Sequence, residues 1–307
     1  MWYICNMDLV REKLLFLIST PLYAFLIGGE MLLSFFHDRK FYSTKGTFMN
    51  VWLSALNLGL DILLRGFVLV FLAYFFQFRF TEINTPWIYW TILLFTEDFM
   101  FYWLHRVDHY CRLFWAVHVT HHSSEEFNLT VGFRSSVFQP LYRFIWFIPL
   151  PLLGFRGEDV MLMYAITQIY GILIHTQYFK NLGPLEWFMS TPSHHRVHHG
   201  SNIKYLDKNL GMVFIFWDKL FGTFQKEEEE VVYGLTTNID QPYHPVKTVF
   251  HEWFSIGNDL KKPASIKAKF MYVFGPPGWS HDGSRKTSRE LREEMKNSEI
   301  DHLKIKD

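Results

Sequence analysis

The chain of 307 residues has few cysteines and no excess of charge of either sign. Its two cysteines, Cys5 and Cys111, cannot form the several bridges of a secreted disulfide scaffold. The 30 lysines and arginines balance 30 aspartates and glutamates, which argues against the basic surface that nucleic-acid binding needs. We therefore expect no nucleic-acid partner. The N-terminal region also lacks a clear small-residue cleavage site after its apolar run, so we interpret that run as a retained membrane anchor.

Long apolar stretches fill the first half of the chain and predict an all-α membrane protein. Five stretches share this character: 14–36, 51–78, 87–104, 137–155 and 160–179. Each of the first three is close to the roughly 20 residues that a spanning helix requires. The last two, joined by a Gly-Phe-Arg-Gly turn, predict a membrane-buried helical hairpin. Asp61 and Arg65 lie four residues apart on one helical face, so we expect them to neutralise each other within the membrane.

The polar part of the chain predicts a helical, histidine-rich domain that caps three spans and the hairpin. We divide the chain into N-terminal membrane spans (1–90), a histidine-rich catalytic region (91–225) and a cytosolic C-terminal segment with a charged tail (226–307). The loop 37–50 carries three basic residues and one aspartate, whereas the loop 79–85 carries one residue of each sign. Because cytoplasmic loops are enriched in Lys and Arg, we expect an integral membrane protein with its histidines on the cytosolic face. The membrane would be the inner membrane of a bacterium or the endoplasmic reticulum of a eukaryote.

Fifteen histidines are the second unusual feature of the composition, and most of them form three clusters. Within a helix, side chains three and four positions apart share a face, so the histidines of each cluster can converge on one metal. Neutral imidazole binds iron, copper, zinc and nickel, and eight or nine such ligands are too many for one ion. The sequence therefore predicts a two-metal site, with His194 either a ligand or a structural neighbour. The candidate ligands are His105, His109, His118, His121, His122, His175, His194, His195, His198 and His199.

Other metal chemistries agree less well with these clusters. Zinc proteolysis needs a glutamate directly after the first histidine of H-E-x-x-H, and Arg106 occupies that position in the first cluster. Carboxylate-bridged di-iron bundles use Glu-x-x-His pairs, and we find none in a suitable place. A non-catalytic metal-binding or transport protein stays an alternative, although transport should place ligands along the spans, whereas most of these histidines lie outside them.

Side chains near the clusters are candidates for orienting the imidazole rings through their free N–H groups. Asp98 is favoured, because it lies two helical turns before His105 and is an acid at membrane depth. For each candidate the alternative is a helix cap or a surface charge, and we predict no catalytic residue beyond the metal ligands. The candidates are Asp98, Asp108, Glu125, Asn128, Asp207 and Asn209.

The order of the clusters, H-x3-H, H-x2-HH and H-x2-HH between membrane helices, resembles the fatty acid hydroxylase/sterol desaturase superfamily of membrane di-iron enzymes. Residues 102–106 (YWLHR), 120–125 (THHSSE) and 181–224 are most similar to its alkylglycerol monooxygenase-like branch. The resemblance covers roughly residues 90–280. It implies two iron ions, O2, a membrane lipid substrate, and an electron donor that is a pterin or a redox protein.

The activity that this resemblance implies is O2-dependent hydroxylation of a lipid C–H bond. In the alkylglycerol branch the hydroxylated carbon lies next to an ether oxygen. The hydroxylated product then breaks at the bond between this carbon and the ether oxygen. A lipid or sterol desaturase on the same scaffold is the alternative among enzymes. The oligomeric state is left open.

Overall fold

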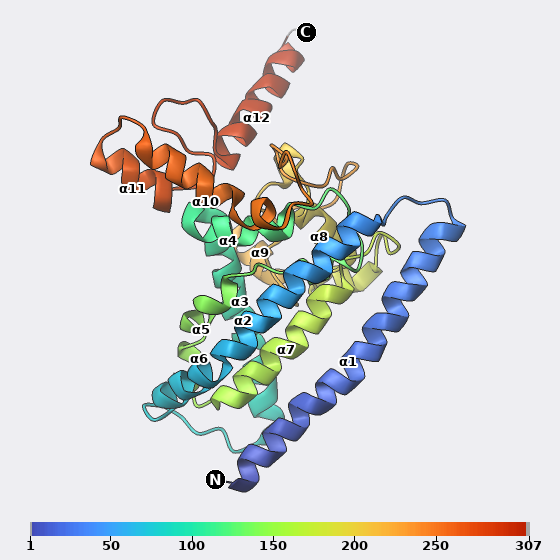
Figure 1. Cartoon of the computed structure of the whole chain (residues 1–307), viewed down its shortest axis with the longest axis vertical. Coiled ribbons are helices and arrows are strands. Elements are labelled where there is room, and N and C mark those ends of the chain that lie inside the picture. The colour runs from blue at the N-terminus through green and yellow to red at the C-terminus, as the bar shows by residue number, and fades with distance from the viewer. Residues whose placement is uncertain (1, 305–307) are drawn as a thin grey trace.

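The computed structural model describes residues 2–304, and in this range it contains helices and loops, with two isolated bridges and no extended strand. The predicted all-α class is confirmed. The long helices are α1 (Trp2–Phe36), α2 (Thr44–Phe76), α3 (Pro86–Tyr110) and α7 (Gly157–Leu173). Figure 1 shows the axes of α1, α2 and α7 roughly aligned, with the chain running through α2 opposite to α1 and α7, and α7 contacts α1, α2 and α3. This arrangement makes α7 the central packing partner of the long helices.

The remaining helices are short, and most of them lie toward the end of α3 that carries the histidines (Figure 1). They connect, brace or extend the long helices. In chain order they are α4 (Arg112–His122), η1 (Val131–Phe133), η2 (Gln139–Leu141), α5 (Arg143–Trp146), α6 (Pro149–Leu152), η3 (Gly183–Trp187), α8 (Pro192–His198), η4 (Ile203–Tyr205), α9 (Phe216–Phe221), α10 (Pro245–Lys261), α11 (Ile266–Phe274) and α12 (Ser288–Lys304).

Among the described residues, two helices are long and apolar enough to cross a membrane: Leu17–Phe36 within α1, and Thr44–Phe76. Large apolar side chains on both are highly exposed, among them Phe25 at 77% and Leu63 at 78%. Such surfaces suit lipid tails better than water. The third predicted span lies in α3, where the acidic side chains of Glu97 and Asp98 are buried against the protein. A count of three spans stays a prediction.

The second arm of the predicted hairpin is one continuous helix, whereas its first arm is divided into short helices. Residues 160–179 correspond mainly to α7. Residues 137–155 instead form three short helices, η2, α5 and α6. Proline lacks the backbone N–H that continues a helix, and its ring clashes with the preceding turn. Pro149, the first residue of α6, therefore explains the interruption between α5 and α6.

A buried ionic network fixes the C-terminal helices to α4. Arg112 of α4 donates to Glu252 at 2.6 Å and to Asp259 at 2.7 Å, both on α10, and Arg285 donates to Asp259 at 2.6 Å. Burial by itself raises the pKa of Asp259, but hydrogen bonds from Lys262, Arg112 and Arg285 outweigh it and lower the pKa to about 2. Because α4 carries three of the candidate ligands, this network braces the metal centre from outside.

Candidate metal centre

Nine of the ten predicted ligands come together in two adjacent groups, in each of which the ligand atoms lie within 4.8 Å of one another. They come from α3, from α4, from the segment after α7, and from α8 with the residue that follows it. Eight of the nine are buried and His121 is half-buried. The first group is His105, His109, His118, His122 and His198, and the second is His121, His175, His195 and His199.

The division between the groups differs from the expectation that each cluster converges on one metal. On α4, His118 and His122 belong to the first group, and His121 belongs to the second. Near α8, His195 and His199 belong to the second group, and His198 belongs to the first. Residues four apart are separated by about 40° around a helix and residues three apart by about 60° on the other side. The i and i+4 positions therefore share one group, and the remaining histidine turns toward the other.

Backbone carbonyls determine which nitrogen of several rings carries the proton. A carbonyl oxygen only accepts, so a ring nitrogen bonded to it must be the N–H donor, and the opposite Nε2 then keeps its lone pair. Nδ1 donates to a carbonyl in four rings: His105 to Leu210 (2.7 Å), His121 to Arg134 (2.9 Å), His175 to Gly171 (2.7 Å) and His198 to Lys208 (3.0 Å).

The Nε2 atoms of several rings converge within each group. Nε2 of His105 lies 3.0 Å from that of His118, and Nε2 of His175 lies 2.9 Å from that of His195. Nε2 of His109 and of His198 are buried and have no hydrogen-bond partner in the described part of the chain. Converging lone pairs in a dry site are unfavourable unless a cation binds between them. These residues therefore fit a metal in each group.

The electrostatics of the site keep the rings in their metal-binding form. Burial lowers the pKa of His121 to about 4, and it lowers the pKa of His122 and of His198 well below the ordinary value of about 6.5, with neighbouring histidines acting in the same direction. These imidazoles are therefore neutral at pH 7. A neutral imidazole, unlike an imidazolium, has a lone pair for a metal.

His194, the tenth predicted ligand, lies outside both groups. It is the third residue of α8, and its Nδ1 lies 3.3 Å from the backbone nitrogen of Thr191 and 3.4 Å from its hydroxyl oxygen. This arrangement is a capping box at the start of α8. The side chain thus positions the helix that carries His195 and His198.

Two of the six predicted orienting side chains lie near a ligand ring. Asp207 Oδ1 lies 3.3 Å from Nδ1 of His109. Asp108 Oδ2 lies 3.9 Å from Nδ1 of His118, and this carboxylate accepts hydrogen bonds from Gln139 and Tyr142. The hydroxyl of Ser136, which the sequence analysis did not select, is closer to the His118 ring at 3.2 Å.

The other four candidates have different partners in the described part of the chain. Asp98 accepts from the backbone of Val213 and Phe214 and from the Trp217 indole, so it holds a loop instead of a ring. Glu125 has an exposed side chain. Asn128 binds the Phe41 carbonyl and caps its own turn, and Asn209 binds the carbonyls of His194 and Gln225.

Sequence reasoning also missed Asp218. It is fully buried in α9 and accepts hydrogen bonds from the backbone nitrogens of Leu210 (2.7 Å) and Gly211 (2.8 Å). Because the Leu210 carbonyl receives the His105 ring, Asp218 fixes the acceptor that orients this ligand. The motif F-W-D-K alone contains no signal for that role.

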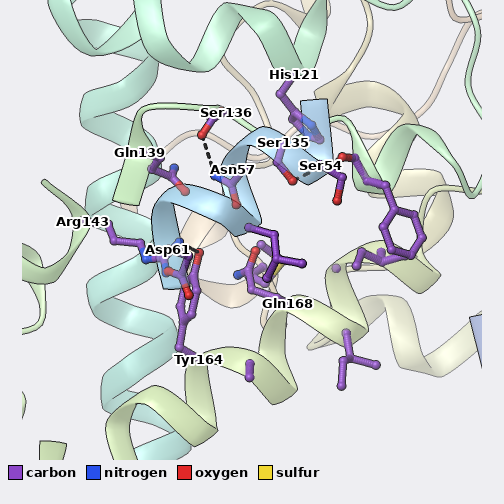
Figure 2. A pocket seen from close by; sticks show the side chains of 18 of the residues that line it. Ser54, Asn57, Asp61, His121, Ser135, Ser136, Gln139, Arg143, Tyr164 and Gln168 are labelled. Atoms are coloured by element: carbon purple, nitrogen blue, oxygen red, sulfur yellow. Dashed lines mark hydrogen bonds and ion pairs between the residues drawn. The ribbon is translucent and has the colours of Figure 1, made fainter. Parts of the chain in front are cut away.

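A cavity of about 610 Å3 borders both histidine groups and extends between α1, α2 and α7. Its volume is within the usual range for small-molecule sites. Figure 2 shows that polar side chains line part of it, among them Asp61 of α2 and Arg143 of α5. Asp61 forms an ion pair with Arg143, and Arg65 Nη1 lies 3.9 Å from its other oxygen. The predicted pairing of Asp61 with Arg65 therefore occurs, with Arg143 as the closer partner.

Comparisons with known proteins agree with this site. Residues 90–223 match the model of the family described as fatty acid hydroxylase. Human alkylglycerol monooxygenase is 43% identical over 213 residues, which are 69% of this chain and 46% of that protein. The Xenopus tropicalis alkylglycerol monooxygenase is 36% identical over 240 residues (75% of this chain and 53% of that protein), and an ornithine lipid hydroxylase of Rhizobium tropici is 32% identical over 128 residues (41% and 39%).

The chain spans about half the length of the alkylglycerol monooxygenases that it matches. No solved structure shows a significant match. The family match, over residues 90–223, includes all nine histidines of the two groups. The histidine-bearing region of this chain, residues 90–223, belongs to the fatty acid hydroxylase family.

Proposed function

We propose that this protein is an O2-dependent, di-iron membrane monooxygenase that hydroxylates a C–H bond of a lipid. The observation that carries the proposal is the convergence of nine imidazoles in two groups beside a cavity between membrane-capable helices. All-nitrogen sites of this kind suit iron among other transition metals. The family match and the similarity to monooxygenases and hydroxylases of lipids support iron and oxygen chemistry among the possibilities.

In this proposal the five-histidine group would hold one iron and the four-histidine group the second. The bound metal would supply O2 activation and oxidation of the C–H bond. The chain's own contribution is to orient the imidazoles through their Nδ1 hydrogen bonds and to exclude bulk water from the site by burial. The cavity would position the lipid carbon beside His105, His118, His121, His175 and His195, which line it.

We infer an ether lipid as the substrate, with hydroxylation next to the ether oxygen. One oxygen atom of O2 would enter the C–H bond, and the other would leave as water after taking two electrons and two protons. The resulting hemiacetal would collapse to an aldehyde and a glycerol. The similarity to alkylglycerol monooxygenases over about 70% of the chain supports this choice.

The proposal includes a location and a donor. We propose that the chain is divided at residues 90 and 225 and that the histidine-rich region lies on the cytosolic side of the membrane. The two electrons would come from a pterin or from a redox protein. The nine grouped histidines are the proposed ligands, and His194 is proposed as a helix-capping residue, since its ring engages Thr191.

The test is product analysis with purified, iron-loaded protein in lipid nanodiscs, supplied with 1-O-hexadecylglycerol, O2 and a pterin reductant. We expect O2-dependent formation of hexadecanal. His121→Ala should abolish it, whereas His37→Ala, which changes an exposed histidine outside both groups, should not. A product with a new double bond would indicate a desaturase instead, and the absence of any O2-dependent product would refute the proposal.

A further inference from the structure

Helix α11 presents a stripe of large apolar side chains on its outer face. Ile266, Phe270 and Phe274 follow one another at intervals of four residues and are 88%, 59% and 47% exposed. At 100° per residue they lie within about 80° of one another around the helix. Ala268 and Tyr272, on the opposite side, are buried and form the face that packs on the protein. Such an apolar outer face is unfavourable in water and indicates a surface that contacts something else.

Lysines border this stripe on both sides. At the same 100° per residue, Lys267 lies about 60° from the centre of the stripe, and Lys269 lies about 100° from it in the other direction. The segment 260–281 contains four lysines and neither aspartate nor glutamate. Long lysine side chains can extend along an apolar surface to its polar edge. An apolar stripe with lysines along its edges is typical of a helix that lies in the interface of an anionic membrane leaflet.

The direction of α11 agrees with such a position. Figure 1 shows α10 and α11 sloping across the direction of α1, α2 and α7. Because α1 and α2 contain the membrane-capable segments of the described residues, a helix that crosses them lies closer to the membrane plane than to its normal. The adjoining α10 has a related outer face, on which Phe254 is exposed and Lys247 and Lys261 lie seven residues before and after it. Seven residues are about two helical turns, so these three side chains share that face.

A second copy of this chain is a poorer occupant of the stripe. In a two-fold symmetric dimer the same surface of each copy meets the other. Lys267 and Lys269 would then face their own copies, and the segment 260–281 supplies no carboxylate to neutralise them. Like charges at close range repel each other. An anionic lipid headgroup supplies the missing negative charge, and the acyl chains beneath it supply an apolar contact for the stripe.

We propose that α11 lies in the interface of an anionic membrane leaflet, with its apolar stripe among the acyl chains and Lys267 and Lys269 at the lipid phosphates. This position would also fix the depth of the metal centre. The Arg112 guanidinium donates to the Tyr272 carbonyl at 3.2 Å, and the Arg112 backbone nitrogen donates to the Gly275 carbonyl at 2.9 Å. These bonds join the end of α11 to the start of α4, which carries three of the grouped histidines.

Photochemical cross-linking to lipid tests the inference. The photoreactive amino acid benzoylphenylalanine replaces Phe270 in the full chain, which is placed in nanodiscs with equal amounts of phosphatidylglycerol and phosphatidylcholine. Illumination should attach lipid to this position, as detected by mass spectrometry, with the anionic lipid enriched at least about threefold. The same amino acid in place of Arg289 of α12, whose side chain is 83% exposed, should attach no lipid.

Substitution of the lysines separates the charge from the apolar stripe. Lys267→Gln combined with Lys269→Gln should abolish the enrichment of phosphatidylglycerol, whereas cross-linking to phosphatidylcholine should persist because the stripe is unchanged. Lys296→Gln, a change of an exposed lysine on α12, should leave the enrichment as it is in the unmodified protein. Neither Lys267 nor Lys269 is buried, so the Tm of the double variant should stay close to that of the unmodified protein.

Three results would overturn the inference. The absence of a lipid adduct at position 270 would place the stripe in water. A cross-link between two copies of the chain, in place of lipid, would assign the stripe to a dimer. Equal yields of the two lipids with the lysines intact would remove the preference for an anionic leaflet. None of these outcomes depends on iron, O2 or turnover, so they do not bear on the proposed monooxygenase.

Discussion

Asp207 offers the most selective perturbation of the metal centre, because it contacts a ligand ring with a side chain that can be replaced. Four of the rings are oriented by backbone carbonyls, which no substitution removes. The His109 ring instead faces the Asp207 carboxylate at 3.3 Å. Asp207 has a φ of +55°, in the left-handed region that asparagine also tolerates. Asp207→Asn therefore removes the negative charge without straining the backbone.

The expected loss of metal affinity is small because the substitution keeps a hydrogen-bond acceptor beside His109. Replacing a side chain that orients a metal ligand typically lowers metal affinity by about 10-fold to 100-fold. Asparagine retains an acceptor oxygen for the His109 N–H and loses only the charge, so we expect the lower end, about tenfold or about 1.4 kcal/mol. The effect should be confined to the five-histidine group, since His109 belongs to that group.

A chelator-competition titration on the purified protein measures this prediction. The unmodified chain should release its two metals over a narrow range of chelator concentration. Asp207→Asn should release one metal at about tenfold lower chelator and the other at the unmodified concentration. Asp240→Asn, a matched change of an exposed carboxylate, should behave as the unmodified protein. Equal weakening of both metals, or no weakening of either, would refute the assignment of Asp207 to one group.

Three further predictions concern the ligands and the bracing of the site. His198→Ala should lower the metal content to about one ion per chain and abolish turnover, because His198 belongs to the five-histidine group; full occupancy by elemental analysis would contradict this. Metal removal should lower the Tm, because it leaves buried Nε2 atoms such as that of His109 without a partner; an unchanged Tm in differential scanning calorimetry would count against it. Asp259 has a pKa of about 2 in the fold, below its ordinary value, so the stabilisation that its ionised form contributes is complete above about pH 5 and is lost as the pH falls toward 2. Unfolding measured between pH 6 and pH 3 should therefore depend less on pH in Asp259→Asn, and an equal dependence would contradict the network with Arg112.

The set of histidine ligands could be predicted from the sequence because it depends on spacings within single helices. Three and four residue spacings place side chains on one helical face whatever the rest of the fold does. The division into two groups could not be read in the same way. It depends on how α8 faces α4, so that His198 joins His118 and His122 while His121 joins His195.

The orienting partners were the least predictable part of the site. Most are backbone carbonyls, which leave no residue-type signal, such as that of Leu210 for His105. Asp98 met the criteria of position and charge, but the segment that includes Val213 folds over it and takes up its oxygens. That contact joins residues 115 positions apart in the chain, a separation that helical periodicity does not address.

The partners of the charged residues that line the cavity were also only partly predictable from the sequence. The sequence correctly placed Asp61 opposite Arg65 on one helix, since that pairing is local. Its closer partner, Arg143, comes from the short helix α5, 82 positions along the chain, a separation that helical periodicity does not address. That these charged side chains lie together in the lining of the cavity could therefore be seen only in the three-dimensional structure.

In the proposed enzyme, nine histidines hold two iron ions per chain. The most direct measurement is elemental analysis of protein purified from iron-replete membranes, combined with Mössbauer spectroscopy of the iron-57 form. We predict about two iron atoms per polypeptide, in two nitrogen-rich environments. A stoichiometry of one metal or fewer per chain, or zinc in place of iron, would contradict it.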